Sequence, residues 1–401
     1  MTNISIFSYI YSVANIVIIG GGAAGCFCAA VLSTLRPGWN ITVLEAGKRP
    51  MAKLAVTGGG RCNITNTFEG TESLQLVYPR GYNLMKKALG RFGWRDCLEW
   101  FAGRGVAFTI QPDHCVFPES QDAMQIVHVL ENEMKRGGVH VQCDSKIYSL
   151  DQINPRPDAI VITTGGGTAE ILSCTGLSIE DPVPSLFTFK IDDSGIKELM
   201  GTVVQDVTLG IAGTKFRSHG TLLLTDWGIS GPATLRLSSY AARHLAQNGY
   251  KGSLLVNWLG LSIDEASSML SGLSKSSGRT IANSHPSALT DRLWRMLVSR
   301  AGIRPDCRWD ELGSKGLARL LNVLCSDTYA ITGRARFKEE FVTCGGVSLS
   351  EVNPATMEAR SFPGLFFAGE VLDIDAVTGG FNLQAAWSTA WIAAHSIAEK
   401  Y

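Results

Sequence analysis

Strand-like and helix-like patterns of apolar residues alternate over the first part of the chain. Residues 15–19 form a continuous β-branched run, residues 20–25 break it with glycines, and a helix of small residues follows to about Leu35. Residues 40–44 (NITVL) alternate like a second strand, which ends at Glu45. Strand, tight turn, helix and second strand together predict a βαβ unit.

Later segments continue this pattern and then interrupt it. Helical periodicity over residues 83–104 and 121–136 is accompanied by strand patterns at 139–143 and 158–163, which predict that the parallel sheet continues. Residues 186–259 instead form short alternating segments separated by Gly and Asp-Asp turns. Such segments are typical of an antiparallel sheet or barrel.

The last part of the chain changes period again. Residues 262–328 have a helical period, and a short strand pattern follows around 336–343. A buried strand is predicted at 364–368, and a long helix rich in Ala and Trp at 382–398. These two elements return the chain to the first sheet, so the prediction is an α/β protein with an inserted region that is first β and then α.

Composition narrows the class of protein. The chain has 401 residues, 45% of them hydrophobic, with 36 basic and 36 acidic side chains and a formal net charge of zero. This length supports a substantial core and two domains. Zero net charge favours neither nucleic acid nor an anionic membrane, so a small-molecule ligand is expected.

The apolar runs are far shorter than the roughly 20 residues that a membrane helix needs, so no membrane span is predicted. The apolar residues 1–15 lack a basic region and are interpreted as a short extension, with an interfacial anchor as the alternative. The ten cysteines form no CxxC pair, and neither they nor the seven histidines have metal-ligand spacing. Reduced thiols, a cytoplasmic location and no metal site are expected, and no pattern specifies an oligomeric state.

The strongest chemical signal follows the first strand. The sequence VIIGGGAAG places Gly20, Gly22 and Gly25 in a GxGxxG pattern at the start of a helix. The first glycine permits the tight turn, the second lets backbone approach a pyrophosphate, and the third lets helix and strand pack closely. The helix N-terminus offers N–H groups and a positive dipole end to the phosphates. Glu45 is expected to accept hydrogen bonds from a ribose diol, so the motif predicts dinucleotide binding; the alternative is a tight turn without a ligand.

The C-terminal segment favours FAD over NAD as that dinucleotide. Gly369 and Glu370 end a buried strand, Asp373 follows, and TGGFN at 378–382 opens the last helix. Glycines at this point admit a ligand against the backbone, and the helix N-terminus can face the N1/C2=O edge of a reduced flavin. The alternative is an ordinary glycine cap.

Two further glycine clusters stand at predicted strand ends, TGGGRCN at 57–63 and TTGGG at 163–167. Each either passes close to the cofactor or forms a plain turn. Neither has the full GxGxxG between a strand and a helix, so no dedicated nicotinamide domain is predicted. NAD(P)H would then act as a transient electron donor, and the absence of CxxC argues against a disulfide reductase.

Three residues are weaker candidates for chemistry. Cys62 is next to Arg61, whose guanidinium could lower the thiol pKa, but a structural role is the preferred interpretation. His114 and His219 are expected in loops and are candidates for acid–base work.

These motifs together resemble those of a known family. GGGAAG, TGGGRCNITN, LTDWGISGPATLRLS (224–238) and the long C-terminal stretch from TCGGV through TGGFN to AWIA are similar to the BaiN/YhiN-like flavoproteins. These are bacterial FAD-dependent proteins, often labelled NAD(P)/FAD-dependent or aminoacetone oxidase-like oxidoreductases. The similarity covers nearly the whole chain after residue 15.

The resemblance implies a Rossmann-like FAD-binding domain split by an insertion. The first part of the FAD-binding domain is expected at 15–185 and the second part at 341–401. The inserted domain is expected at 186–340, barrel-like at 186–260 and 330–340 and helical at 261–329.

The motifs and the resemblance also assign a set of cofactor-binding residues. They are Gly20, Gly22, Ala23, Ala24, Gly25, Glu45, Ala46, Gly59, Gly60, Arg61, Cys62, Asn63, Thr164, Gly165, Gly369, Glu370, Asp373, Thr378, Gly379, Gly380, Phe381 and Asn382. The chain departs from the family at two places: the loop after Gly167 is shorter, and Asp226 stands where members usually have histidine. These departures imply a different substrate or a lost activity.

The leading hypothesis is an FAD-dependent oxidoreductase that passes a hydride between flavin N5 and a small organic substrate, either reducing a C=C bond or oxidising an amine. No residue is assigned as the proton donor. The alternative is a flavin-binding redox sensor that modulates a partner without turnover, as the shortened loop suggests. RNA modification is disfavoured by the sequence, because the net charge is zero and no basic stripe is present.

Overall fold

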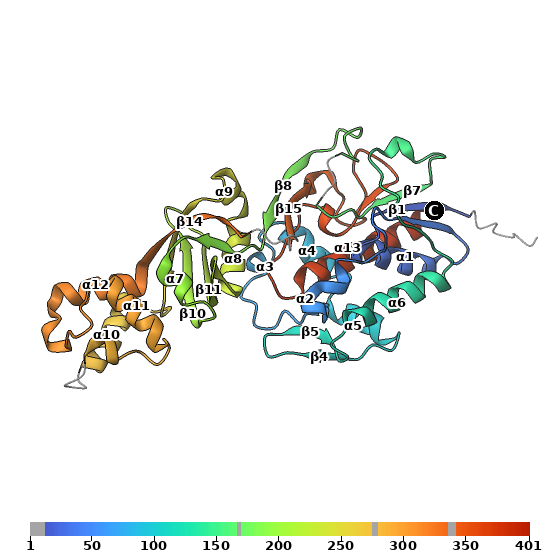
Figure 1. The fold of residues 1–401 in the computed structure, drawn as a ribbon. Coiled ribbons are helices and arrows are strands. Elements are labelled where there is room, and N and C mark those ends of the chain that lie inside the picture. The colour runs from blue at the N-terminus through green and yellow to red at the C-terminus, as the bar shows by residue number, and fades with distance from the viewer. Residues whose placement is uncertain (1–12, 167–169, 275–279, 336–341) are drawn as a thin grey trace, which may run out of the picture. The chain divides into compact units, whose positions relative to one another are not determined.

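The computed structural model describes residues 13–166, 170–274, 280–335 and 342–401 (Figure 1). They divide into two compact units. The first comprises the described residues up to Pro182 together with Gly345–Tyr401, and the second comprises Val183–Cys344. Two strands that pair with each other, β8 (Ile179–Ser185) and β15 (Val342–Val347), carry the chain out of the first unit and back.

A five-stranded sheet in which every pairing is parallel forms the centre of the first unit. Its strands, in spatial order, are β16 (Leu365–Phe367), β7 (Ala159–Ile162), β1 (Asn15–Ile19), β2 (Asn40–Leu44) and β6 (His140–Gln142). The chain places β2 on one side of β1 and β7 on the other. In open α/β sheets, ligands bind at such a switch point, outside the carboxyl ends of the strands.

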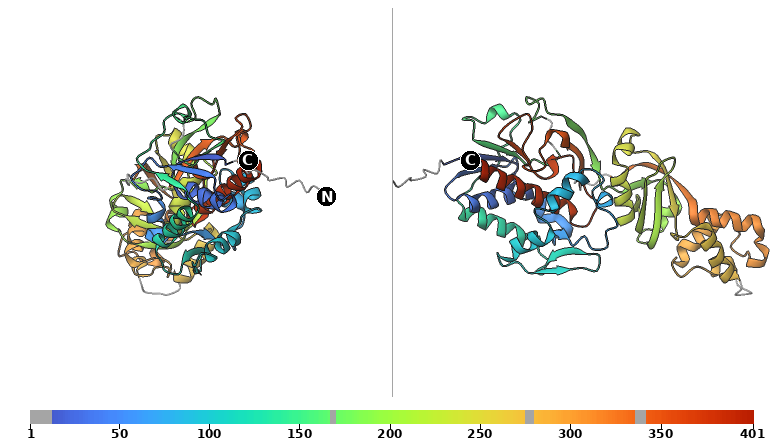
Figure 2. Two further views of the ribbon diagram at one scale, coloured as in Figure 1. Left: turned by 90° about the vertical axis from the view of Figure 1, so that its right-hand side faces the viewer. Right: turned by 180° about the vertical axis from the view of Figure 1, so that it is seen from behind.

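Helix α1 (Ala23–Leu35) packs between α13 (Phe381–Lys400) and α6 (Ala123–Arg136). The blue α1 and the red α13 lie side by side in Figure 1 and in the right-hand view of Figure 2. Both helices are buried around most of their circumference and contain many small residues, among them Ala29 and Ala30 of α1. A helix that is apolar all round is expected in such a buried position.

The segment between β2 and β6 forms a second layer of short elements. It contains α3 (Leu74–Val77), α4 (Tyr82–Leu89), α5 (Trp94–Ala102) and a three-stranded antiparallel sheet of β3 (Thr65–Asn66), β5 (Cys115–Pro118) and β4 (Phe108–Ile110). The helical pattern expected over 83–104 is divided into α4 and α5. Gly90 caps the first helix, and Gly93 begins the second with its N–H donated to Asp96.

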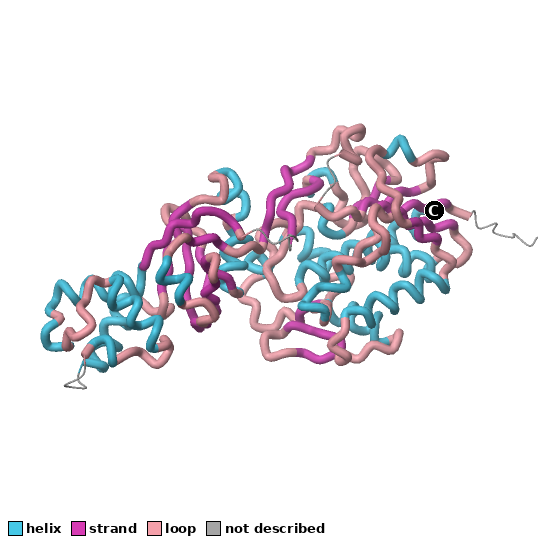
Figure 3. Tube along the Cα trace, viewed as in Figure 1, coloured by secondary structure: helices cyan, strands magenta, loops and turns pink. Residues whose placement is uncertain are grey.

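The second unit is a closed barrel with a helical part inserted between two of its strands, seen as magenta strands and cyan helices in Figure 3. The barrel strands are, in order, β10 (Val203–Ile211), β11 (Arg217–Thr225), β12 (Gly228–Ser230), β9 (Phe189–Ile191), β14 (Asp327–Arg334) and β13 (Gly252–Asn257). Helices α10 (Ile263–Ser274), α11 (Asp291–Arg300) and α12 (Gly313–Ser326) lie in the chain between β13 and β14. Most of the strand expected at 336–343 lies outside the described residues.

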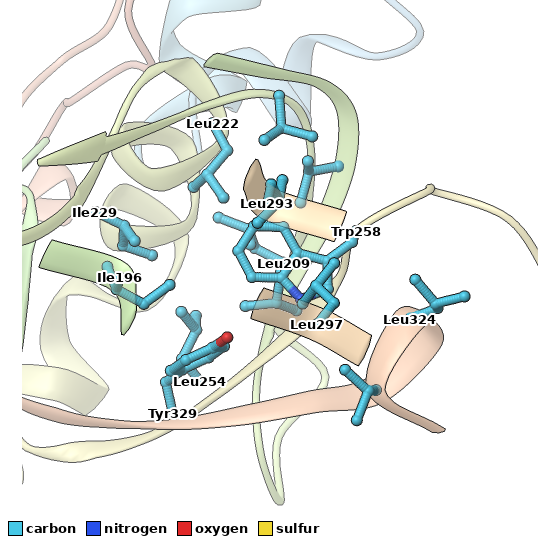
Figure 4. Close-up of a cluster of buried hydrophobic side chains, with 14 of the residues drawn as sticks. Ile196, Leu209, Leu222, Ile229, Leu254, Trp258, Leu293, Leu297, Leu324 and Tyr329 are labelled. Atoms are coloured by element: carbon cyan, nitrogen blue, oxygen red, sulfur yellow. The ribbon is translucent and has the colours of Figure 1, made fainter. Parts of the chain in front are cut away.

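Barrel and helices of the second unit share one apolar core (Figure 4). Leu209, Leu254 and Trp258 contribute to it from the barrel side, and Leu297 and Leu324 from the helices. This shared burial makes the β-then-α region one unit. Of the helices in the described ranges, none combines the length and the apolar character that crossing a bilayer requires.

Candidate cofactor site at the carboxyl edge of the parallel sheet

The three glycines after β1 occupy three different environments. Gly20 has φ +107°, and a Cβ there would lie 2.5 Å from the carbonyl oxygen of Thr163 at the end of β7. A Cβ on Gly25 would lie 2.0 Å from the carbonyl oxygen of Gly20, so only glycine allows α1 to pack this closely on the turn. A Cβ on Gly22 would meet no atom within 4 Å. The first and third glycines thus serve the fold, whereas the second borders open space at the start of α1.

This open space has the properties of a pyrophosphate cradle. Gly22 is the N-cap of α1, and the first N–H groups of a helix have no partner within the helix. The positive end of the helix dipole favours an anion at the same point. The residues present therefore fit the diphosphate of FAD, with Gly22, Ala23 and Ala24 as the groups that would hold it.

Glu45 has a definite role in the turn. One carboxylate oxygen accepts the N–H of Gly21 at 2.7 Å, and the other accepts the N–H of Gly47 at 2.6 Å. Glu45 therefore holds the glycine turn against the end of β2 and fixes the position of Ala46. The hydroxyl of Thr163 fastens the turn from the β7 side, donating to the carbonyl of Gly20 at 2.7 Å. Whether Glu45 also bonds a ribose stays a prediction.

The loop at 57–63 is a run of left-handed backbone. Gly58, Gly59, Gly60 and Cys62 all have φ between +58° and +83°. A Cβ on Gly59 or Gly60 would meet no atom within 4 Å, so these two glycines also border open space.

Cys62 and Arg61 do not form a reactive pair. The Cys62 side chain is buried, and this burial raises the thiol pKa to about 12. The guanidinium of Arg61 instead stacks on Phe117, with 4.4 Å between its Cζ and the ring centroid, and donates to the carbonyl of Gly58. Cys62 is therefore a neutral, structural thiol at ordinary pH. The ten cysteines all lie within the described residues, and none of them forms a disulfide.

The segment after β16 reaches the same edge of the sheet. A Cβ on Gly369 would lie 2.8 Å from the Cβ of Ala24, so glycine is needed here for contact with α1. The Glu370 carboxylate pairs with Lys53 at 3.1 Å and lies 3.7 Å from the position of a Cβ on Gly165. Thr164 and Gly165 follow β7 directly. Residues 20–25, 45, 164–165 and 369–370 therefore meet at the carboxyl ends of four neighbouring strands.

The TGGFN turn packs against the loop at 57–63 and against β3. Gly380, with φ +86°, is the N-cap of α13, and a Cβ on it would lie 2.4 Å from the carbonyl oxygen of Thr65. In the orientation that satisfies both groups, the Asn63 amide donates to this carbonyl at 3.0 Å and accepts the N–H of Gly380 at 3.3 Å. Asn382 is engaged with the backbone, because its side chain accepts from the N–H of Ala376 and donates to the carbonyl of Ala376.

Three other expected residues of this segment have defined surroundings. The ring of Phe381 packs edge-on against Phe68, with centroids 5.0 Å apart, and its carbonyl accepts from the Tyr78 hydroxyl at 2.9 Å. The backbone N–H of Asp373 donates to the carbonyl of Val347 at 3.0 Å. Gly379 has φ +130°, which makes glycine the natural residue between Thr378 and the helix cap.

Sequence reasoning missed the contacts that hold this turn in place. The Arg80 guanidinium makes a two-bonded ion pair with the buried carboxylate of Asp375, and the N–H of Val377 donates to the carbonyl of Val77 at 3.0 Å. Gln384 is buried in α13 and accepts from the Thr65 hydroxyl at 2.5 Å. The one available signal was the position of Asp375 within the largely apolar run VLDIDAV, because a carboxylate buried there needs a cationic partner.

The two candidate histidines lie in different units of the structure. His114 is in a turn before β5, 3.9 Å from the Glu69 carboxylate, in the first unit. His219 lies on β11 in the second unit, with its ring 3.2 Å from the Thr208 hydroxyl. Asp226 lies between β11 and β12 in the second unit as well.

Comparison with known proteins decides the family. A model described as the HI0933-like protein Rossmann domain matches residues 14–396. This chain belongs to the HI0933-like Rossmann family. The family expected from the sequence, a group of flavoproteins that includes the BaiN/YhiN-like proteins, is thereby confirmed, and so is the fold class: a Rossmann-like FAD-binding domain, with a barrel as its second component.

Relatives with curated names are similar over almost their full length. The "Ribosomal RNA dihydrouridine synthase" of Escherichia coli (strain K12) is 30% identical, over 95% of this chain and 97% of that protein. The "3-dehydro-bile acid delta(4,6)-reductase" of Clostridium scindens is 26% identical, over 96% and 98%. Among solved structures, a 3-ketosteroid delta1-dehydrogenase from Sterolibacterium denitrificans has the same fold, with a TM-score of 0.50, 12% identity and coverage of 97% and 100%.

Proposed function

We propose that this protein is an FAD-dependent reductase that saturates a C=C bond conjugated to a carbonyl group. The observation that carries the proposal is the glycine turn, in which Gly20 and Gly25 are required by packing while Gly22 leaves open space at the N-terminus of α1. That arrangement fits the diphosphate of a dinucleotide. When bound, FAD supplies hydride chemistry that no amino-acid side chain provides.

The protein's own contribution is positioning. Residues 20–25 and Glu45 would hold the ADP half, because they lie at the ends of the adjacent strands β1 and β2. Gly59, Gly60 and Gly165 would let backbone approach the rest of the cofactor. The TGGFN turn would place the start of α13 near the flavin, where its positive end favours a negative charge on the reduced ring.

The names of the two relatives support C=C reduction over amine oxidation. Forming dihydrouridine from uridine saturates the C5=C6 bond next to a carbonyl, and a delta(4,6)-reductase of a 3-keto steroid acts on a conjugated C=C bond. The shared chemistry is addition of hydride to one carbon and of a proton to its neighbour. We propose this reaction type for the chain, with the substrate in the same electronic class.

RNA is also a candidate substrate for the proposed reaction. Zero net charge describes the whole chain and not one surface, so it does not exclude a nucleic-acid substrate. A relative that matches 95% of this chain is named for action on ribosomal RNA. The exclusion of nucleic acid is therefore not supported.

The test is anaerobic reoxidation of the chemically reduced wild-type protein. The flavin would first be released from a sample and identified as FAD or FMN. Reduced protein would then be mixed with a conjugated enone, with a uridine-containing RNA hairpin and with a saturated ketone as the control. We expect reoxidation by an unsaturated substrate together with its saturated product, and none by the control. Failure of every unsaturated substrate would favour a flavin-binding redox sensor instead.

NADH and NADPH would be tested as electron donors in a second step. The expected result is flavin bleaching by one of them, without a stable complex of the kind that a dedicated nicotinamide domain would form. This step concerns only the donor, so its outcome leaves the test of the reductive reaction unchanged.

A further inference from the structure

A surface pocket of about 360 Å³ lies in the first unit, apart from the glycine cradle. Its walls come from α4 and from the segment after β15, which are distant in sequence. The residues that carry the argument are Tyr82, Asn83, Lys87, Leu349, Pro354 and Arg360. A volume at the lower end of the range for small-molecule sites, roughly 300–1,000 Å³, suits one compact ligand or one unit of a larger one.

The charge of the pocket is entirely positive. Lys87 and Arg360 both line it, and no carboxylate is among its lining residues. Within the part of the chain that the structure describes, no ion pair or side-chain hydrogen bond engages either cation. Two cations from separate segments that face one pocket without an internal counter-ion make a site for an external anion.

The start of α4 adds a second attraction for an anion. Gly81, with φ +80°, is its N-cap, and the first-turn residues Tyr82, Asn83 and Leu84 all line the pocket. Their N–H groups come before the first intrahelical bond, made by the N–H of Met85 to the carbonyl of Gly81. Asn83 and Lys87 are four residues apart and therefore lie on the same face of the helix. Helix dipole and cations thus act on one space.

The remaining walls suit a flat organic body next to that anion. Tyr82 supplies an aromatic ring, and Leu349 and Pro354 supply apolar surface from the opposite segment. Bases stack on aromatic side chains whatever their sequence, while Lys and Arg bind phosphate. An anionic group next to a flat ring is the chemistry of a nucleotide.

Gly81, which lines the pocket, also packs against the loop that precedes α13. A Cβ on Gly81 would lie 2.6 Å from Ile374 and 3.3 Å from the carbonyl oxygen of Asp373. The neighbouring Arg80 is paired with Asp375 in the same loop. The start of α4, which forms one wall of the pocket, is therefore held against the segment that leads into the TGGFN turn.

We propose that this pocket binds a phosphorylated nucleotide unit, supplied either by an RNA substrate or by a nicotinamide dinucleotide donor. The choice of an RNA substrate or a nicotinamide donor as the source of the nucleotide rests on the proposed function. The recognition of a phosphate and a flat ring rests on the pocket alone. Lys87 and Arg360 bind the phosphate, and Tyr82 stacks with the base or the nicotinamide ring.

The experiment measures binding to the oxidised, FAD-loaded protein. NADP⁺ would be titrated by calorimetry and a short RNA hairpin by fluorescence anisotropy, with inorganic phosphate as a competitor in each. Lys87→Gln and Arg360→Gln should each weaken the bound probe about tenfold, the scale of one charge-assisted contact. Lys86→Gln is the matched control, because Lys86 is exposed on the same helix, one residue away, and does not line the pocket.

The probe that responds identifies the source. Loss of affinity for NADP⁺ alone assigns the pocket to the donor, and loss for RNA alone assigns it to the substrate. If neither probe binds the wild type, or if Lys86→Gln has as large an effect as Lys87→Gln, the proposal is overturned. FAD content and thermal unfolding of each variant show that the fold is retained.

Failure here and failure of the proposed function are distinguishable. The reaction is tested on reduced wild-type protein with a phosphate-free enone, which does not need this pocket. Binding that depends on Lys87 and Arg360, without any reoxidation by unsaturated substrates, would support the nucleotide pocket and contradict the proposed reductase activity. Reoxidation without such binding would do the reverse.

Discussion

The guanidinium of Arg80 and the carboxylate of Asp375 form a two-bonded ion pair across 295 positions of sequence. The Asp375 side chain is fully buried and that of Arg80 is 15% exposed. The two residues also form a backbone bridge. This pair fastens the segment before α4 to the loop before α13, and so fixes the loop that leads into the TGGFN turn.

Breaking this pair should destabilise the protein strongly. Arg80→Gln leaves a buried carboxylate without its cation, and the expected loss of unfolding free energy is about 3–5 kcal/mol. Urea unfolding would measure it. Arg136→Gln is the control, because Arg136 pairs with Glu133 but is 79% exposed, and it should change stability little. Equal effects of the two variants would show that the buried pair does not hold the loop.

Gly22→Val should separate cofactor binding from folding. Gly22 has φ −79°, which valine adopts, and a Cβ there meets no protein atom within 4 Å. The apoprotein should therefore unfold normally, while crowding of the cradle weakens FAD by about 1–3 kcal/mol. Gly252→Val, at another glycine with open space around it, should retain the flavin. Full FAD content in Gly22→Val would mean that the turn does not meet a pyrophosphate.

Glu45→Ala should weaken FAD by roughly 1.5–3 kcal/mol, the cost of losing hydrogen bonds to a charged group. Glu45→Gln should be nearly as poor, because its amide nitrogen would face one of the two N–H groups that the carboxylate now accepts. Fluorescence titration of the apoprotein with FAD would measure both variants. Unchanged affinity in both would contradict a role for Glu45 in the cofactor site.

Alanine substitutions at two glycines with positive φ, Gly38 and Gly380, should separate the cost of backbone strain from the cost of a steric clash. Gly38→Ala, at φ +91° with no atom near the new Cβ, should lose only the conformational term of about 1–2 kcal/mol. Gly380→Ala, at φ +86°, also places its Cβ 2.4 Å from the carbonyl oxygen of Thr65 and should lose clearly more. Chemical unfolding of both variants would test this, and equal losses would argue against the close contact.

A redox titration of the Gly380 variant would report on the helix end itself. If α13 is displaced while FAD remains bound, the flavin midpoint potential should fall by tens of millivolts, since a dipole effect of about 0.3–2 kcal/mol sets the scale. An equal or higher potential at full FAD occupancy would mean that the helix only packs.

Cys62 should resist alkylation in the folded protein. Burial raises its pKa to about 12, so the thiol stays neutral below that pH and the reactive thiolate is scarce. The exposed Cys174 should be modified first by iodoacetamide, as peptide mass spectrometry would show. Because an unfolded thiol loses its proton near pH 8.5, Cys62 favours the folded state below that pH, and this contribution declines as pH rises toward 12. Rapid modification of native Cys62 near neutral pH would contradict its burial.

The sequence by itself determined the elements whose physics is local. A β-branched run, three spaced glycines and a small-residue helix specify β1, the turn and α1, because positive φ at Gly20 and close packing at Gly25 leave only glycine at those two positions. The glycines of the TGGFN turn follow from the same rule at the start of α13. Strands that alternate with helical segments predicted the parallel sheet, and short alternating strands separated by Gly and Asp-Asp turns predicted the barrel region.

Only the tertiary structure decided what each of these side chains does. Asn382 closes a turn on Ala376, Gly380 approaches Thr65, and Arg61 turns onto Phe117 and away from Cys62. The ion pair between Arg80 and Asp375 was likewise not predictable, because periodicity and motifs describe only residues that are close along the chain. The partner of a buried charge and the environment of a buried thiol are set only when distant segments pack together and exclude water.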